Sequence, residues 1–215
     1  MNYNNTKKYS ICIKIELIKK VLRGLLFSLF FLKTRHLVAI GKNVTIVGKK
    51  NEFIVGRRVK IEDGAFIQSV SKNGVILGDN VTICQNAIIR TSGFYGGKLG
   101  WGLVMGHHSS IGAASYIGCS GKIEIGNNVM IGPHCTMIAE NHNYADKTMD
   151  MIKQGVSNIG IQVKDNVWIG ANVTILDGVV IETGCILAAG AVVTKSTEPN
   201  GIYAGIPAKK IKDRI

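Results

Sequence analysis

An aliphatic residue recurs at every sixth position over most of the chain after residue 40. Clear units occupy residues 40–45, 77–82 and 125–130, and an unbroken series starts at residue 163. The fifth position is small or β-branched, and the fourth is usually Asn or Gly, as at Asn43, Gly64, Asn80, Asn86, Asn128, Asn166, Asn172, Gly178, Gly184 and Gly190. Because Asn and Gly tolerate a left-handed backbone, the pattern predicts a sharp corner every six residues, with short strands between corners.

Short strands turned at regular corners wind into a prism, in which each strand pairs with its equivalent in the next coil. A β-sandwich would instead show alternation with a period of two and turns about 8–12 residues apart. We therefore predict an all-β fold, a parallel β-helix of hexapeptide repeats over residues 39–198. A short C-terminal tail follows at residues 199–215.

Residues 1–38 lack the repeat and are predicted to form a helical segment. Their uncharged stretch, residues 24–32, has nine residues, whereas a membrane-spanning helix needs about twenty. Two interpretations stay open for this segment. It caps the open end of the solenoid, or it lies as a basic amphipathic helix on an anionic membrane, with contact through residues 11–35.

The formal net charge of +12 favours an anionic partner, such as nucleotide phosphates, an acidic saccharide or the inner face of a membrane. No nucleic-acid-binding motif accompanies the charge, so we expect no nucleic acid partner. The five cysteines show no metal-binding or disulfide spacing, and Cys135 and Cys185 occupy the small fifth position. We therefore expect these cysteines to be reduced and to serve packing, in a cytoplasmic protein. If residues 11–35 contact a membrane, we expect the protein to lie peripherally on its inner face.

The repeat breaks after residue 137 and resumes at residue 163, so residues 140–160 are predicted to leave the prism as an extended loop. A long loop on a regular scaffold is a common place for function. This one holds His142, whose side-chain type titrates near neutral pH and suits a general base. Glu140, Asn141, Tyr144 and Asp146 lie beside it in the sequence.

Four features in order resemble the hexapeptide-repeat acyltransferases, in the branch of the sugar and polysaccharide O-acetyltransferases. These are the repeats, the loop at 140–146, the segment 165–171 and the tail at 203–209. The resemblance implies a left-handed coil with three hexads per turn and a homotrimer with an active site at each subunit interface. It also implies acetyl-CoA as co-substrate, a saccharide acceptor and no metal.

The resemblance also implies roles for individual residues. His142 is the general base, and Glu140 is a candidate for positioning it. Trp168, at an outward position of its hexad, packs near the pantetheine arm. The candidates for binding are Ala171, Ala189, Lys195 and Lys212 for the coenzyme, and Asn141, Tyr144 and Asp146 for the acceptor.

Other functions stay open at this stage. Gly112 stands where the small-galactoside branch has an asparagine, and residues 151–155 resemble enzymes of cell-surface polysaccharide assembly. Serine, an antibiotic or the amine of a nucleotide sugar are alternative acceptors, and a non-catalytic solenoid is a further alternative. The γ-class carbonic anhydrases share the fold and bind zinc through three histidines.

The carbonic anhydrase alternative lacks one histidine, because position 147 is Lys. The remaining candidates for three zinc ligands are His107, His134 and His142, which match the carbonic anhydrase pattern poorly. His107, His108 and His134 are otherwise expected either to line the acceptor pocket or to lie on the surface.

Overall fold

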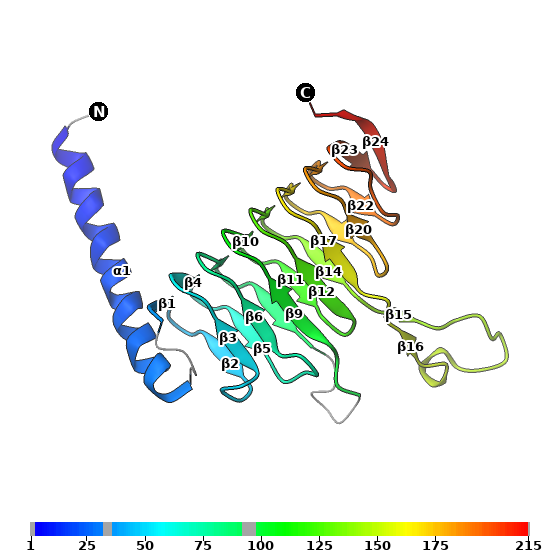
Figure 1. Cartoon of the computed structure of the whole chain (residues 1–215), viewed down its shortest axis with the longest axis horizontal. Coiled ribbons are helices and arrows are strands. Elements are labelled where there is room, and N and C mark those ends of the chain that lie inside the picture. The colour runs from blue at the N-terminus through cyan, green and yellow to red at the C-terminus, as the bar shows by residue number, and fades with distance from the viewer. Residues whose placement is uncertain (1–2, 32–35, 92–97, 215) are drawn as a thin grey trace.

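The computed structural model describes residues 3–31, 36–91 and 98–214 of the chain. One helix, α1 (Tyr3–Phe31), precedes a left-handed parallel β-helix whose strands form three faces of a prism (Figure 1). From coil to coil, the strands of each face pair in parallel and in register; in β18 and β21, for example, Trp168 pairs with Ile186 and Ile169 with Leu187. The predicted fold is confirmed.

Each face is one sheet. Face A consists of β1 (Val38–Ile40), β4 (Val59–Ile61), β7 (Thr82–Ile83), β10 (Ser110–Ile111), β13 (Met130–Ile131), β18 (Trp168–Ile169), β21 (Ile186–Leu187), β23 (Gly201–Gly205) and β24 (Ala208–Asp213). Face B consists of β2 (Thr45–Val47), β5 (Phe66–Gln68), β8 (Ile88–Arg90), β11 (Tyr116–Gly118), β14 (Thr136–Ile138), β19 (Thr174–Ile175) and β22 (Val192–Val193). Face C consists of β3 (Phe53–Val55), β6 (Val75–Leu77), β9 (Gly102–Met105), β12 (Lys122–Ile125), β17 (Ile161–Val163) and β20 (Val180–Ile181).

The corners fall where the hexads predict them. All ten Asn and Gly residues expected at corners have a positive φ, from 53° at Asn43 to 79° at Gly178. The interior is filled by the first and fifth residues of the hexads, and Ile169 and Val173 are both fully buried. The narrow core therefore explains why the fifth position admits only small or β-branched side chains.

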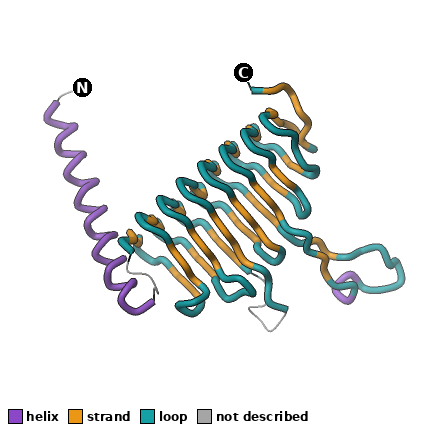
Figure 2. The backbone as a smooth tube through the Cα atoms, in the orientation of Figure 1, coloured by secondary structure: helices purple, strands orange, loops and turns teal. Residues whose placement is uncertain are grey.

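The three edges of the prism differ in their tolerance of extra residues. Four residues join face A to face B in every coil, as in residues 170–173. The connection from face B to face C instead varies, from three residues at 119–121 to the twenty-two of 139–160. All long insertions therefore project from the same edge (Figure 2).

The C-terminal half of α1 packs against β1 and caps the first coil. A Cβ atom at Gly24 would lie 1.7 Å from the carbonyl oxygen of Val38, so only glycine permits this approach. Arg23 Nε donates a 2.9 Å hydrogen bond to the carbonyl of Ile40, and Phe27 packs on the core. No helix among the described residues is long and apolar enough to cross a membrane.

The residues expected as a C-terminal tail form a hairpin that continues face A. Strand β23 pairs parallel with β21 and antiparallel with β24. Tyr203 is buried, and its hydroxyl accepts a 2.7 Å hydrogen bond from the backbone N–H of Glu198. The hairpin thus covers the last coil and closes the open edge of the sheet.

Candidate active site

The loop at 140–160 forms an arm that projects from the edge between faces B and C (Figures 1 and 2). Its base is a two-stranded antiparallel ribbon of β15 (Asn141–His142) and β16 (Val156–Ser157), in which Asn141 pairs with Ser157 and His142 with Val156. A 3₁₀ turn, η1 (Met151–Lys153), lies near its tip. The ribbon gives His142 a fixed backbone position at the foot of the arm.

Gln154 holds the arm together, although it lies outside the hexapeptide repeat and was not predicted to have a role. Its side-chain Nε2 donates to the carbonyls of Asp146 and Met149 at 2.8 and 2.9 Å, and its Oε1 accepts from the N–H of Asp146 at 3.1 Å. Asn143 Nδ2 donates to the Gln154 carbonyl at 3.0 Å. One glutamine therefore satisfies three backbone groups of a loop that has no core of its own.

Asp146 contributes to the same turn. Its Oδ1 accepts hydrogen bonds from the hydroxyl of Thr148 at 2.6 Å and from its backbone N–H at 2.8 Å. These bonds favour the ionised form, so they lower the pKa of the Asp146 carboxyl, the hydroxyl having the larger effect. The Asp146 carboxylate therefore stabilises the turn at residues 146–148 of the arm.

The other residues predicted around His142 are spread over the foot of the arm. His142, Asn141 and Tyr144 are exposed, and Tyr144 is 74% accessible. Glu140 is half-buried and lines a cavity of about 540 Å³ at the foot of the arm. No hydrogen bond joins Glu140 to His142 within the described residues, so a positioning role for this carboxylate remains a prediction.

The same cavity is lined by Trp101 and Lys72, neither of which was predicted from the sequence. The Lys72 ammonium lies 4.8 Å from the centre of the Trp101 ring, and this indole is 41% exposed. An accessible indole face is a surface on which a pyranose ring can stack. The sequence contained one feature that could have identified Trp101 as a site residue. It is an aromatic residue beside a stretch in which the hexapeptide repeat is irregular.

Trp168 and the two alanines lie away from the arm, on face A and on the edge between faces A and B. Trp168 begins β18 on face A and is 52% exposed, as its outward hexad position predicts. Ala171 and Ala189 occupy the edge between faces A and B in successive coils, joined by a 2.8 Å bond from Gly190 N–H to the Ala171 carbonyl. The N–H groups of both alanines have no acceptor among the described residues.

Lys195 and Lys212 are both exposed near the C-terminal end of the solenoid. Lys212 lies in β24 opposite Ile202, and Lys195 is the second residue after β22. Lys210, between them in the hairpin, is paired with Glu198 and Asp213 at 2.6 and 2.8 Å. Lys195 and Lys212 have no ion pair with a carboxylate of the described chain, which leaves their charge available to an anion.

One chain does not bring the predicted site together. His142 stands at the edge between faces B and C, Trp168 lies on face A, and Ala171 stands at the edge between faces A and B. Within one chain, face B separates the edge of His142 from the edge of Ala171.

The remaining histidines have structural positions. His108 and His134 occupy left-handed corners, each with φ of 56°. His107 Nδ1 accepts a hydrogen bond from the backbone N–H of Asp79 at 3.0 Å. Across the described residues, no three His, Cys, Asp or Glu side chains are grouped so that they could hold a metal ion.

Cys135 and Cys185 pack in the core at the fifth position of their hexads, as predicted. Cys119, Cys135 and Cys185 are buried. Burial raises the pKa of the Cys119 thiol far above its ordinary value, and it raises that of Cys135 in the same direction. Thiols that stay protonated are poor nucleophiles.

Comparison with known proteins agrees with this fold. Residues 160–195 match the family model of the bacterial transferase hexapeptide, with six repeats, and residues 58–90 match the hexapeptide repeat of succinyl-transferase. Both matches fall within the β-helix and are to models of hexapeptide-repeat transferases. A variant of the Bacillus cereus N-acyltransferase AntD, solved with dTDP-4-amino-4,6-dideoxyglucose and coenzyme A, has the same fold, with a TM-score of 0.54 and 22% identity over 86% of this chain and 83% of that chain.

Curated relatives of this hexapeptide-repeat protein include a Schizosaccharomyces pombe protein named as an acetyltransferase, 43% identical over 91 residues. The match covers 42% of this chain and 42% of that protein. The galactoside O-acetyltransferase of Escherichia coli is 35% identical over 92 residues, which are 42% of this chain and 44% of that enzyme. The chain thus spans less than half the length of these two relatives.

Proposed function

We propose that this chain is an acetyl-CoA-dependent O-acetyltransferase that acetylates a hydroxyl of a sugar or of a cell-surface polysaccharide precursor. The active site lies between neighbouring subunits of a homotrimer. His142 of one chain and the edge carrying Trp168, Ala171 and Ala189 of the next chain form its two sides. The names of the relatives support the reaction class, and the position of His142 on a separate edge from Ala171 is the observation that carries the shared site.

The free N–H groups at the A–B edge support the binding of the donor. Pantetheine carries amide carbonyls, and a chain of unpaired backbone donors at Ala171 and Ala189 suits them. Their small side chains leave the backbone accessible. Trp168 offers an apolar wall beside them, and Lys195 and Lys212 supply positive charge for the phosphates.

The reaction is a direct transfer. His142 removes the proton from the acceptor hydroxyl as its oxygen attacks the thioester carbonyl. The carbon–sulfur bond then breaks, and the imidazolium returns the proton to the departing thiolate, which gives the acetyl ester and free coenzyme A. The Ala171 N–H, which has no partner in the described chain, is suited to stabilise the oxyanion that forms between these steps.

The arm supports the choice of a saccharide acceptor. The cavity at its foot presents the exposed Trp101 ring, the Lys72 ammonium and the Glu140 carboxylate. An aromatic face with charged groups at its rim is typical of carbohydrate sites. The basic chain, with a net charge of +12, favours an acceptor that carries negative charge.

A subunit-mixing experiment tests the shared site. His142→Ala removes the base and Ala189→Trp fills the donor edge, so each variant alone should lose most of its release of free thiol from acetyl-CoA with a panel of saccharides. When the two variants are co-expressed and mixed trimers are purified by two tags, one of the three interfaces in each mixed trimer carries both intact sides, so about a third of the activity should return.

The control is a set of trimers mixed from two differently tagged His142→Ala chains, which should stay inactive. Coenzyme A binding by calorimetry should survive in His142→Ala and fail in Ala189→Trp. Mixed trimers that form but regain no activity would contradict the shared site. Full activity of His142→Ala would contradict the proposed base.

A further inference from the structure

Helix α1 carries an apolar face that the solenoid does not cover. We define the outer stripe as its exposed leucines and isoleucines on this face, between 45% and 71% accessible: Ile11, Ile15, Ile18, Leu22, Leu25, Leu26 and Leu29. They follow one another at intervals of three and four residues for most of the helix. At 3.6 residues per turn, such spacing places them in a single band about 100° wide.

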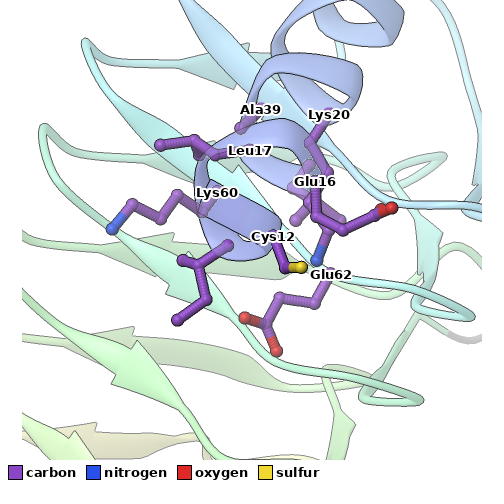
Figure 3. A pocket seen from close by; sticks show the side chains of 9 residues that line it. Cys12, Glu16, Leu17, Lys20, Ala39, Lys60 and Glu62 are labelled. Atoms are coloured by element: carbon purple, nitrogen blue, oxygen red, sulfur yellow. The ribbon is translucent and has the colours of Figure 1, made fainter. Parts of the chain in front are cut away.

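The opposite face of α1 packs against the coils. Leu17 and Lys20 line a cleft of about 480 Å³ together with Ala39 and Lys60 of the first two coils (Figure 3). Gly24, on the same face, lies against the Val38 carbonyl. The docking of α1 therefore fixes the direction of the outer stripe, which points away from the β-helix.

Positive charge borders the outer stripe on both sides. Lys14 and Lys19 flank it one on each side, because they lie about 60–80° from its centre on a helical wheel. Both are exposed. The sequence of α1 contains six Lys and Arg residues and a single acidic one, Glu16, which pairs with Lys19 at 2.7 Å.

This charge pattern distinguishes between two possible partners of the outer stripe, a second copy of α1 and a lipid surface. The spacing would also suit a helix–helix seam with a second copy of the chain. In such a seam, the flanking positions of two identical helices face each other, so Lys14 and Lys19 would meet lysines. A surface of anionic lipid headgroups instead meets both flanks with opposite charge.

We propose that α1 lies in the surface of an anionic phospholipid bilayer. The outer stripe enters the boundary of headgroups and acyl chains, and Lys14 and Lys19 contact the headgroup phosphates. The stripe extends over nineteen residues, about 27 Å of helix, which suits a helix parallel to the membrane. The N-terminal end of α1 extends away from the coils (Figure 1), and the outer stripe is exposed along its length.

Vesicle flotation with the full chain tests the proposal. The probes are phosphatidylcholine vesicles and vesicles in which about a third of the lipid is phosphatidylglycerol. The protein should float with the anionic vesicles at least tenfold more strongly than with the neutral ones. Ile18→Ser with Leu22→Ser should reduce this binding roughly 100-fold, because two side chains of the stripe no longer enter the bilayer.

The helix offers a matched control. Ile13→Ser with Leu17→Ser changes the same residue types at the same spacing outside the outer stripe, on the side of α1 that lines the cleft; Ile13 and Leu17 are 69% and 46% exposed, so exposure alone does not distinguish the two pairs. Its vesicle binding should remain within about threefold of the unchanged protein. Lys14→Gln with Lys19→Gln should weaken binding roughly tenfold or more, and Lys49→Gln with Lys50→Gln, which removes the same charge from the solenoid, should have a smaller effect.

Sedimentation velocity in the absence of lipid tests whether the outer stripe binds a second copy of the chain instead of a bilayer. The mass of the assembly should be the same for the unchanged protein and for Ile18→Ser with Leu22→Ser. Loss of mass in this variant would assign the outer stripe to a second copy and overturn the proposal. Equal binding to neutral and anionic vesicles, or equal binding by the two double variants, would overturn it as well.

Discussion

The backbone N–H of Asp79 donates a 3.0 Å hydrogen bond to Nδ1 of His107 in the neighbouring coil. The same relationship is repeated along this edge. The N–H of His107 donates to Oδ1 of Asn127 at 2.8 Å, and the N–H of Asn127 donates to Oδ1 of Asp165 at 2.7 Å. His107 is therefore one rung of a ladder in which each side chain accepts from the corner of the preceding coil.

This ladder predicts a structural role for His107. Replacement by Ala removes the acceptor and should lower the free energy of unfolding by about 1 kcal/mol, whereas His107→Asn should preserve it. Urea denaturation followed by circular dichroism measures the difference. Unchanged stability together with a loss of acetyl transfer in His107→Ala would instead place this side chain in the acceptor pocket.

Ala114 occupies a left-handed corner, with φ of 54°, where most equivalent residues are Asn or Gly. Ala114→Asn should therefore raise the free energy of unfolding by roughly 0.5–1 kcal/mol, because Asn adopts this conformation with less strain. The reverse change at an equivalent corner, Asn172→Ala, should lower it by a similar amount. Shifts of the same sign in both variants would show that corner conformation does not control stability at these positions.

Gly24 sets the position of α1. Gly24→Ala would gain about 1 kcal/mol of helix propensity, but its Cβ would overlap the Val38 carbonyl at 1.7 Å. The overlap should dominate, so α1 should separate from the first coil and become sensitive to limited proteolysis. Ser28→Ala, one turn further along the helix, is the control and should leave protection of α1 intact.

The turn of the arm should weaken in acid. Hydrogen bonds from Thr148 hold the pKa of the Asp146 carboxyl below its ordinary value of about 4. The folded pKa is the lower one, so the stabilisation is present above about pH 4 and is lost as the pH falls through the folded pKa. The protection factor of the Thr148 amide, which compares its exchange rate with the intrinsic rate at the same pH, should fall over that range.

Asp146→Asn is the control for this acid effect, because it keeps an acceptor oxygen and cannot titrate. Its Thr148 amide should show only the intrinsic dependence of exchange on pH. If the unchanged protein and Asp146→Asn lose protection in parallel, another group controls the arm.

The sequence predicted the solenoid in detail because each hexad repeats the same physical constraint. Corners at Asn and Gly and small residues beside them follow directly from backbone strain and from the narrow core. Spacing alone also located the corner at His134, where the residue type gives no signal. The edge of the prism at which the arm leaves was evident only from the structure.

The interior of the arm could not be predicted. Gln154 bonds to Asp146 and Met149 through side-chain contacts that follow no period. The sequence also left the face of α1 undecided, since both of its sides are apolar. Gly24 settles which side packs, but only once Val38 is seen against it.

The connections between faces B and C change most in length along the solenoid, while those between faces A and B keep four residues. The two ends of the longest connection bond to neighbouring coils, at Ala139 and at Gly160. Under the proposed function, a designed exchange of the residues between these two ends with those of a homologue would reshape the acceptor side of the site and leave the proposed donor edge intact. The scaffold separates the part that can diverge from the part that must stay the same.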